Sequence, residues 1–283
     1  MVLGANVTVT ATPGSGTGIL FNDAINADNA SSNDRTLTLN SGTGSTIFVT
    51  GTVGNSQALA GLTITQSNGT TFSNTIDVSD SGSGTITLTD TQDNSNIIFN
   101  GNVTADSFVT AAQGYDIFLN ANATFANAVT FQNTGTLDLG NQTSDTLTFN
   151  GGLTTTSVGG TVTLEGTIDT SNDAIVLGAV TLGSNTLIDT NATNTTGDIT
   201  IGAVTGGSNS LTLSMGNNVA NTDISASGAI SGVSTLTLQN IGGTATLSCD
   251  VDVTTLTVGN TVANVAFTGN GSSVTNAFTP AND

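Results

Sequence analysis

Carboxylate and amide oxygens supply most of the chemistry that this sequence could perform. The best-placed of them lie in two short segments. The segment TDTQDNSN contains Asp90, Asp93, Asn94 and Asn96, and a second segment contains Asp250 and Asp252 at alternate positions. Ca²⁺ is a hard cation that takes oxygen ligands, so these residues are candidates for a weak calcium site. No EF-hand loop and no Gly- and Asp-rich nonapeptide occurs, which favours solvated turn residues instead. We expect no cofactor other than this candidate Ca²⁺.

Threonine forms the second candidate surface. It recurs between two apolar residues at regular intervals, which predicts an outward ladder made of Thr38, Thr63, Thr87, Thr163, Thr212, Thr237 and Thr257. Thr-x-Thr arrays of this kind are what ice-binding solenoids present to ice. Threonine also has a high β propensity and packs well on a pleated surface, which is the simpler interpretation. Asp138 and Ile188 are expected to interrupt the column.

The composition excludes several classes of function. The chain of 283 residues has no His, one Lys or Arg and 20 Asp and Glu, for a formal net charge of −19. Histidine catalysis and structural zinc sites are therefore excluded. Nucleic acid is not an expected partner, because phosphate recognition needs cations and Arg35 stands alone. We also expect no membrane insertion, because no run of 18 apolar residues occurs.

Catalysis by paired carboxylates is the remaining enzymatic alternative. Asp169 and Asp173 are the example of such a pair, which on a neutral glycan could act as acid and base. They lie in a polar turn with no aromatic platform, so we expect no enzyme activity. The single cysteine, Cys249, alternates with Leu247 and Val251, which predicts a buried small side chain rather than a reactive thiol.

An internal repeat determines the predicted fold. The tetrapeptide apolar-polar-apolar-polar recurs from Val7-Thr8-Val9 to Leu256-Thr257-Val258, and a second motif, apolar-x-small-x-apolar, follows each copy. Both have a period of roughly 25 residues, with turns rich in Gly, Asn and Asp between them. This predicts an all-β parallel β-solenoid of about 11 coils as a single domain over residues 1–283. Tandem immunoglobulin-like sandwiches are the main alternative, but they need longer units.

The repeat also predicts which residues meet in the core. One buried column should contain Leu37, Leu62, Ile86, Leu137, Val162, Leu211, Leu236 and Leu256. Another should stack Phe72, Phe99, Phe125 and Phe149 on adjacent coils. Asn74 and Asn127 should point inward at the corners. The longer step from Ile86 to Ile117 predicts a longer loop or a bulged coil near residues 104–116.

Several phrases of the sequence resemble a known class of repeats. TLTLNSGTG, ITLTDT, IIFNGNVT, LTFNGGLT and ITIGAVTGGSNSLTLS are similar to repeats of bacterial filamentous-haemagglutinin-type adhesins and of autotransporter passenger domains. The resemblance covers nearly the whole chain and is specific for a class, not for one member. It implies a right-handed β-helix at the bacterial cell surface or outside the cell. It further implies a role as stalk, fibre or coat in adhesion.

The expected partners follow from that resemblance. They are a cell-surface or host glycan or protein receptor, or copies of the chain joined end to end. Direct recognition of glycan or ice by the solenoid face is the alternative function. The first residues, MVLGANVTVT, lack the basic and apolar regions of a signal peptide. We therefore expect an internal piece of a longer fibre or a subunit of a surface assembly.

Overall fold

The chain is an all-β parallel β-solenoid of about 11 turns with about 24 residues in each turn. The computed structural model describes residues 1–11, 14–28, 35–276 and 278. The fold class predicted from the repeat is confirmed, and the parallel pairing rules out immunoglobulin-like sandwiches, whose sheets are antiparallel. The chain divides into two compact units, which are described separately: residues 1–138 with 157–160, and residues 139–156 with 161–283.

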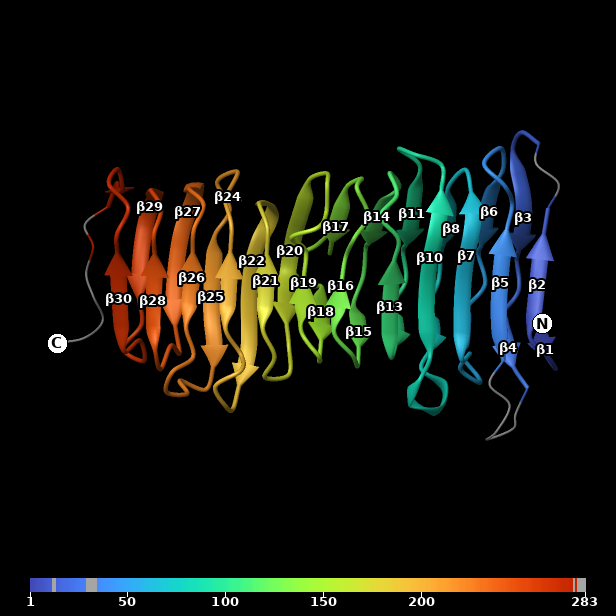
Figure 1. Ribbon diagram of the computed structural model, residues 1–283, viewed down its shortest axis with the longest axis horizontal. Coiled ribbons are helices and arrows are strands. Elements are labelled where there is room, and N and C mark those ends of the chain that lie inside the picture. The colour runs from blue at the N-terminus through green and yellow to red at the C-terminus, as the bar shows by residue number, and fades with distance from the viewer. Residues whose placement is uncertain (12–13, 29–34, 277, 279–283) are drawn as a thin grey trace. The chain divides into compact units, whose positions relative to one another are not determined.

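The first unit consists of short parallel strands joined by Gly- and Asn-rich turns. Its strands are β1 (Val2–Leu3), β2 (Val7–Thr10), β3 (Thr17–Phe21), β4 (Asn26–Ala27), β5 (Thr36–Asn40), β6 (Thr46–Val49), β7 (Gly61–Ser67), β8 (Thr70–Phe72), β9 (Ile76–Val78), β10 (Thr85–Thr91), β11 (Asn96–Phe99), β12 (Val103–Ala105), β13 (Ser107–Thr110), β14 (Asp116–Leu119), β15 (Ala123–Phe125) and β16 (Val129–Thr130). A 3₁₀ turn, η1 (Asp80–Gly82), precedes β10. Strands β2, β5, β7 and β10 lie side by side in one sheet (Figure 1).

The second unit repeats this plan with longer strands. Strand β17 (Leu137–Leu139) has residues in both units. The strands that follow are β18 (Thr146–Phe149), β19 (Leu153–Thr154), β20 (Val162–Asp169), β21 (Ile175–Leu177), β22 (Val180–Ala192), β23 (Ile199–Ile201), β24 (Val204–Thr205), β25 (Leu211–Gly216), β26 (Ile224–Ala226), β27 (Ile230–Gln239), β28 (Thr244–Leu247), β29 (Val251–Val258), β30 (Asn264–Phe267) and β31 (Ser273–Val274).

Alternation within each strand directs every second side chain into the core. In β5, Leu37 and Leu39 are fully buried, while Thr36 and Thr38 are half-buried. The parallel register places like residues on one another in successive turns, as with Leu37, Leu62 and Ile86. In the second unit, Leu211, Leu236 and Leu256 form an equivalent row. Burial of each such side chain contributes about 1.5–3 kcal/mol, so stability accumulates turn by turn.

The prediction that all the repeated aliphatic residues form one column is wrong, although all of them are buried. The row that contains Leu211 continues to Thr186 and then to Gly166, not to Val162. The register of β20 and β22 shifts between Leu164 and Gly166. Since these long strands carry two alternating segments separated by this shift, one repeat motif fits either segment.

The aromatic residues depart from the prediction in a similar way. Phe72 and Phe99 pair in register and stack with ring centroids 5.2 Å apart. Phe125 lies opposite Ala105 instead, and it meets Phe108 edge-on at 5.2 Å. Phe149 belongs to β18 in the second unit. Phe99, Phe125 and Phe131 therefore form a cluster around Phe108 rather than one stack.

The longer loop expected near residues 104–116 is absent, because the repeat was aligned on the wrong residue. Ile86 is followed in its row by Phe108, whereas Ile117 pairs with Ile97 of a different row. Residues 103–110 form the strands β12 and β13. The turn is therefore of ordinary length and is marked by a phenylalanine where the motif has an aliphatic residue.

Close approach between turns requires glycine at the corners. A Cβ on Gly101 would lie 2.3 Å from the carbonyl carbon of Asn74 in the preceding turn. Asn74 itself is exposed, with its Nδ2 donating to the Thr50 carbonyl at 2.8 Å. Asn127 is also exposed, so the predicted inward orientation of these amides is wrong. The corner slot faces the neighbouring backbone and solvent, not the core.

Gly101→Ala tests this packing. We expect a loss of about 1–3 kcal/mol of unfolding free energy, because backbone atoms must move to admit the methyl group. Gly4→Ala is the matched control, because a Cβ there meets nothing within 4 Å. Urea denaturation followed by circular dichroism measures both midpoints. Equal midpoints for the two variants would show that the corner is not tightly packed.

Candidate functional site

Polar groups of the TDTQDNSN turn form hydrogen bonds and contacts with the neighbouring turns. Asp90, on β10, accepts a hydrogen bond from Gln66 Nε2 at 3.0 Å. Asp93 packs against Gly114, and the Asn94 amide nitrogen donates to the Gly114 carbonyl at 2.9 Å. Asn94 adopts a left-handed backbone (φ 59°), which asparagine tolerates, and Asn96 begins β11. These contacts fix the turn to the turns on either side.

Asp250 and Asp252 are exposed and bond to the following turn. Asp250 Oδ1 accepts from the Gly271 amide at 2.8 Å, and Asp252 Oδ1 accepts from Ser273 Oγ at 2.8 Å. In the part of the chain that the structure describes, no three His, Cys, Asp or Glu side chains come close enough to hold a metal ion. A calcium ion at either segment would depend on backbone carbonyls, amide side chains and water for most of its ligands.

Many aspartates act as acceptors for backbone amides one turn away, a role that sequence reasoning missed. Asp116 Oδ1 accepts from the Thr136 amide at 2.6 Å. Asp198 Oδ1 accepts from the Asp223 amide at 2.8 Å, and Asp223 Oδ1 in turn accepts from the Thr244 amide at 2.6 Å. The sequence signal is an Asp just before the first strand of a turn in consecutive repeats. Such carboxylates satisfy buried or crowded N–H groups where the strands begin.

The threonine ladder divides into separate rows. Thr38, Thr63 and Thr87 pair in register in the first unit, with Thr8 preceding them. Thr212, Thr237 and Thr257 pair in register in the second. Thr163 belongs to another row, opposite Thr181.

The rows flanking these threonines are uneven. Gly61 lies between Thr36 and Thr85 in the neighbouring row of the first unit, so the Thr-x-Thr pattern is interrupted there. In the second unit, Leu187 occupies the outward position beside Thr212, and Ile188 is buried. The expectation that Ile188 interrupts the column had the alternation of that strand reversed. A two-row threonine lattice therefore extends over few successive turns.

Asp169 and Asp173 do not form a facing pair. The residue opposite Asp169 in the next turn is Asp189, and Thr148 is opposite it in the preceding turn. Burial raises the pKa of the Asp169 carboxyl above its usual value, and the Asp189 carboxylate raises it further. Hydrogen bonds from the Thr148 and Asn191 side chains act in the opposite direction. Asp173 contributes its carbonyl oxygen to a hydrogen bond from Thr170 Oγ1.

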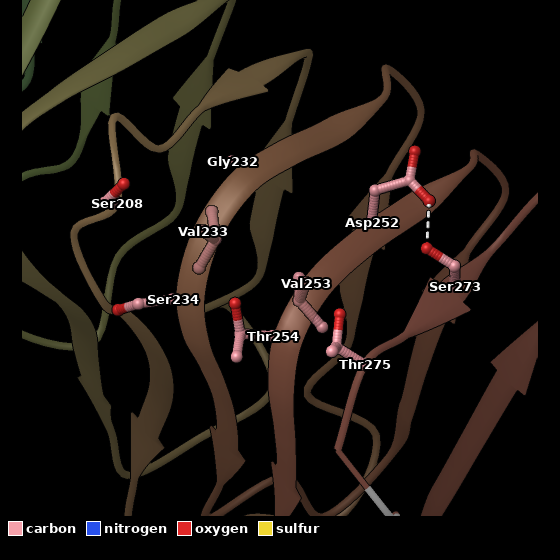
Figure 2. Close-up of a pocket in the computed structure, with 9 residues that line it drawn as sticks. All are labelled: Ser208, Gly232, Val233, Ser234, Asp252, Val253, Thr254, Ser273 and Thr275. Carbon is pink, nitrogen blue, oxygen red and sulfur yellow. Dashed lines mark hydrogen bonds between the residues drawn. The ribbon is translucent and has the colours of Figure 1, made fainter.

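A shallow hollow of about 250 Å³ lies where β27 bends at Gly232. Figure 2 shows the buried Val233 and Val253 at the hollow, with hydroxyls of successive turns around it. These hydroxyls belong to Ser208, Ser234, Thr254, Ser273 and Thr275. Asp252 is the one carboxylate that lines the hollow, and no cation lines it. These groups can form hydrogen bonds, but they contain no activated nucleophile and no acid–base pair.

The single basic residue, Arg35, forms an ion pair, and the single cysteine, Cys249, is buried. Arg35 forms a two-point ion pair with Asp28, at 2.7 and 2.8 Å. Cys249 is 7% exposed, and burial raises the pKa of its thiol. A buried neutral thiol behaves as a small apolar side chain, which agrees with its alternation with Leu247 and Val251.

An outward apolar column is the second feature that sequence reasoning missed. Four apolar residues and one threonine pair in register on the outer side of five successive strands of the first unit. In stacking order they are Leu20, Phe48, Thr71, Ile98 and Phe118. We call this column the apolar stripe. Leu20 is 55% and Phe48 37% exposed. The signal is three apolar residues in a row, as in Ile47-Phe48-Val49, where alternation allows only two to face inward.

Comparison of the chain with protein-family models, with curated proteins and with solved structures finds no match. The comparisons therefore leave the β-solenoid family of the chain unassigned. Among the described residues, no helix has the length and apolar character needed to cross a bilayer.

Asp169→Asn tests the burial of the stacked carboxylates. The pKa of the Asp169 carboxyl is higher in the folded chain than in the unfolded chain, so the folded chain binds this proton more tightly. Protonation of Asp169 therefore stabilises the fold at low pH, and this stabilisation is lost as the pH rises through the folded-state pKa. The amide stays neutral, so the variant should gain stability relative to the parent between pH 4 and 7 and not at pH 3. Urea midpoints across this range measure the difference. Ser225→Ala, an exposed change without a titrating group, is the control, and an unchanging difference for Asp169→Asn contradicts the assignment.

Proposed function

We propose that this chain is a non-enzymatic structural and adhesive segment of a bacterial cell-surface or secreted protein, acting as a stalk, fibre or coat. The observation that carries the proposal is the in-register ladder within each unit. Backbone hydrogen bonds and stacked core residues join successive turns, and several turns are also joined by Asp-to-amide bonds. An arrangement of this kind transmits force between turns without any moving part. Its resemblance to filamentous-haemagglutinin-type and autotransporter repeats supports the same role.

The finer features of the proposal come from that resemblance. They are a right-handed helix, a location outside the bacterial cell, and a cell-surface or host receptor as partner. The surface chemistry supports the location and the partner, because carboxylates, amides and hydroxyls form hydrogen bonds to water and to polar ligands. The hollow at Gly232 contains no acid–base pair among the residues that line it, which supports a non-enzymatic role.

Force spectroscopy tests the mechanical part of the proposal. A turn of about 24 residues releases roughly 80 Å of extended chain. Pulling on both ends should therefore give successive steps in multiples of that length, since each turn is held mainly by its neighbours. The same chain in strong denaturant, the control, should extend without steps. A single all-or-none extension would contradict turn-by-turn resistance.

Copies of the chain are the proposed partners at the ends of the ladder. Within the described residues, β2 pairs only with β5, and β30 only with β28. Among the described residues no second strand pairs with either, and an unpaired strand edge is a template for another strand. The net charge of −19 opposes such contacts by mutual repulsion.

Lowering the charge should promote association. Ordinary Asp carboxyls protonate near pH 3.9, and physiological salt screens exposed charges beyond about 8–10 Å. Light scattering and sedimentation from pH 8 to 4, at low and high salt, should show growth of the particles toward pH 4 and at high salt. A particle that remains monomeric at pH 4 in high salt argues against open-edge contacts.

A further inference from the structure

A second hollow, of about 310 Å³, lies on the apolar stripe of the first unit. Phe48 lies on one side of it and Ile98 on the other, with Thr71 of the intervening turn between them. Gly69, which has no side chain, also lines it. The smaller residue between two large ones produces a notch. Since strands are spaced about 4.8 Å apart, Phe48 and Ile98 are about 10 Å apart along the stack.

Unused amides surround this notch. Ser95 Oγ donates to Asn68 Oδ1 at 3.1 Å. This bond does not use the NH₂ group of Asn68, which can donate to a ligand. Among the residues that the structure describes, the Asn94 and Asn96 side chains have no hydrogen-bond partner. Each amide supplies two donors and an acceptor with two lone pairs. An apolar face bordered by such groups matches a ring whose C–H face is apolar and whose edge carries hydroxyls.

The charges near the hollow exclude anionic ligands. Asp93 adjoins Asn94 in sequence, and Asp116 lies opposite Asn96 in the next turn. Arg35, the one basic side chain, is engaged by Asp28. Carboxylates accept hydrogen bonds from hydroxyl groups but repel phosphate, sulfate and uronate.

The site continues along the stack. Phe118 follows Ile98 in the apolar stripe, and beside it Asn120 Nδ2 donates to Asn100 Oδ1 at 2.9 Å. The apolar contact therefore continues into the next turn. The group opposite Asn96 there is Asp116, and the two amides lie at the other end of the strands. An extended ligand that lies along the stack would meet an apolar side chain at Phe48, Ile98 and Phe118, with hydrogen-bonding groups on either side.

We propose that the hollow between Phe48 and Ile98 binds an uncharged oligosaccharide, which lies along the apolar stripe toward Phe118. Exposed apolar surface of this kind marks a binding site, and the convergent polar groups provide orientation. The inference rests on the proposed adhesive function and identifies its ligand class. A second copy of the chain is the other occupant to consider, but two strongly acidic surfaces repel each other, and a flat sheet would leave the amides of the hollow unpaired.

Phe48→Ala is the decisive variant. A glycan array carrying neutral hexose oligomers and their sulfated and sialylated counterparts identifies the ligand, and calorimetry then measures its affinity. We expect neutral oligomers alone to bind, with at least a ten-fold loss of affinity in Phe48→Ala. Asn96→Ala should weaken binding as well. Phe267→Ala is the matched control, because Phe267 is 43% exposed in the second unit, outside the hollow.

The outcomes separate this inference from the proposed function. Binding of no neutral saccharide, or equal binding by Phe48→Ala and the parent, overturns it. So does a concentration-dependent dimer that Phe48→Ala abolishes in sedimentation, because the stripe is then a contact between copies. The force steps are independent of Phe48, so their presence without saccharide binding leaves the structural role intact. Circular dichroism of each variant checks that it is folded.

Discussion

The backbone hydrogen bonds between successive turns determine which side chains meet. Because they hold the strands parallel and in register, each residue contacts the residue at the same slot of the turns before and after it. Many slots are therefore occupied by similar residues, as when Phe72 stacks on Phe99 or when Ser67 Oγ bonds Thr91 Oγ1 at 2.9 Å. Burial raises the pKa of the Asp169 carboxyl, and Asp189, which shares its slot in the next turn, raises it further. The composition is thus restricted to side chains that stack well.

This constraint contributes to the acidity of the chain. Each turn begins with backbone N–H groups that the strands do not satisfy, and the carboxylates of Asp116, Asp198 and Asp223 accept bonds from them one turn away. Aspartate is short enough to reach such a group and favours turns. Since one turn after another needs the same acceptor, negative charge accumulates without forming a site. The proposed association and ligand choice both depend on that charge.

The sequence was sufficient for the fold, because a parallel solenoid repeats its alternation at a fixed period. It was not sufficient to predict which residues pair in register in successive turns. Alternation has a period of two residues, so a segment such as Leu187-Ile188-Asp189 fits either phase until its neighbours are known, and Ile188 proved to be the buried one. Val162 was placed in the row of Gly166 for a different reason, because β20 carries two alternating segments and the repeat motif fits either of them. The sites were harder still, because Phe48 and Ile98 become neighbours only through Thr71 of the turn between them.

Like-on-like stacking also affects how such a chain can change in length. If the segment from Leu211 to the residue before Leu236 were lost, Leu236 would face the slot that Leu211 had faced, and the row would continue to Leu256. Loss of one residue would instead exchange the inner and outer faces of a strand. Recombination between repeats can therefore add or remove whole turns at little cost to folding, whereas small insertions are tolerated only at the corners. Variation in the number of turns, rather than in the core, is the change that this architecture allows most readily.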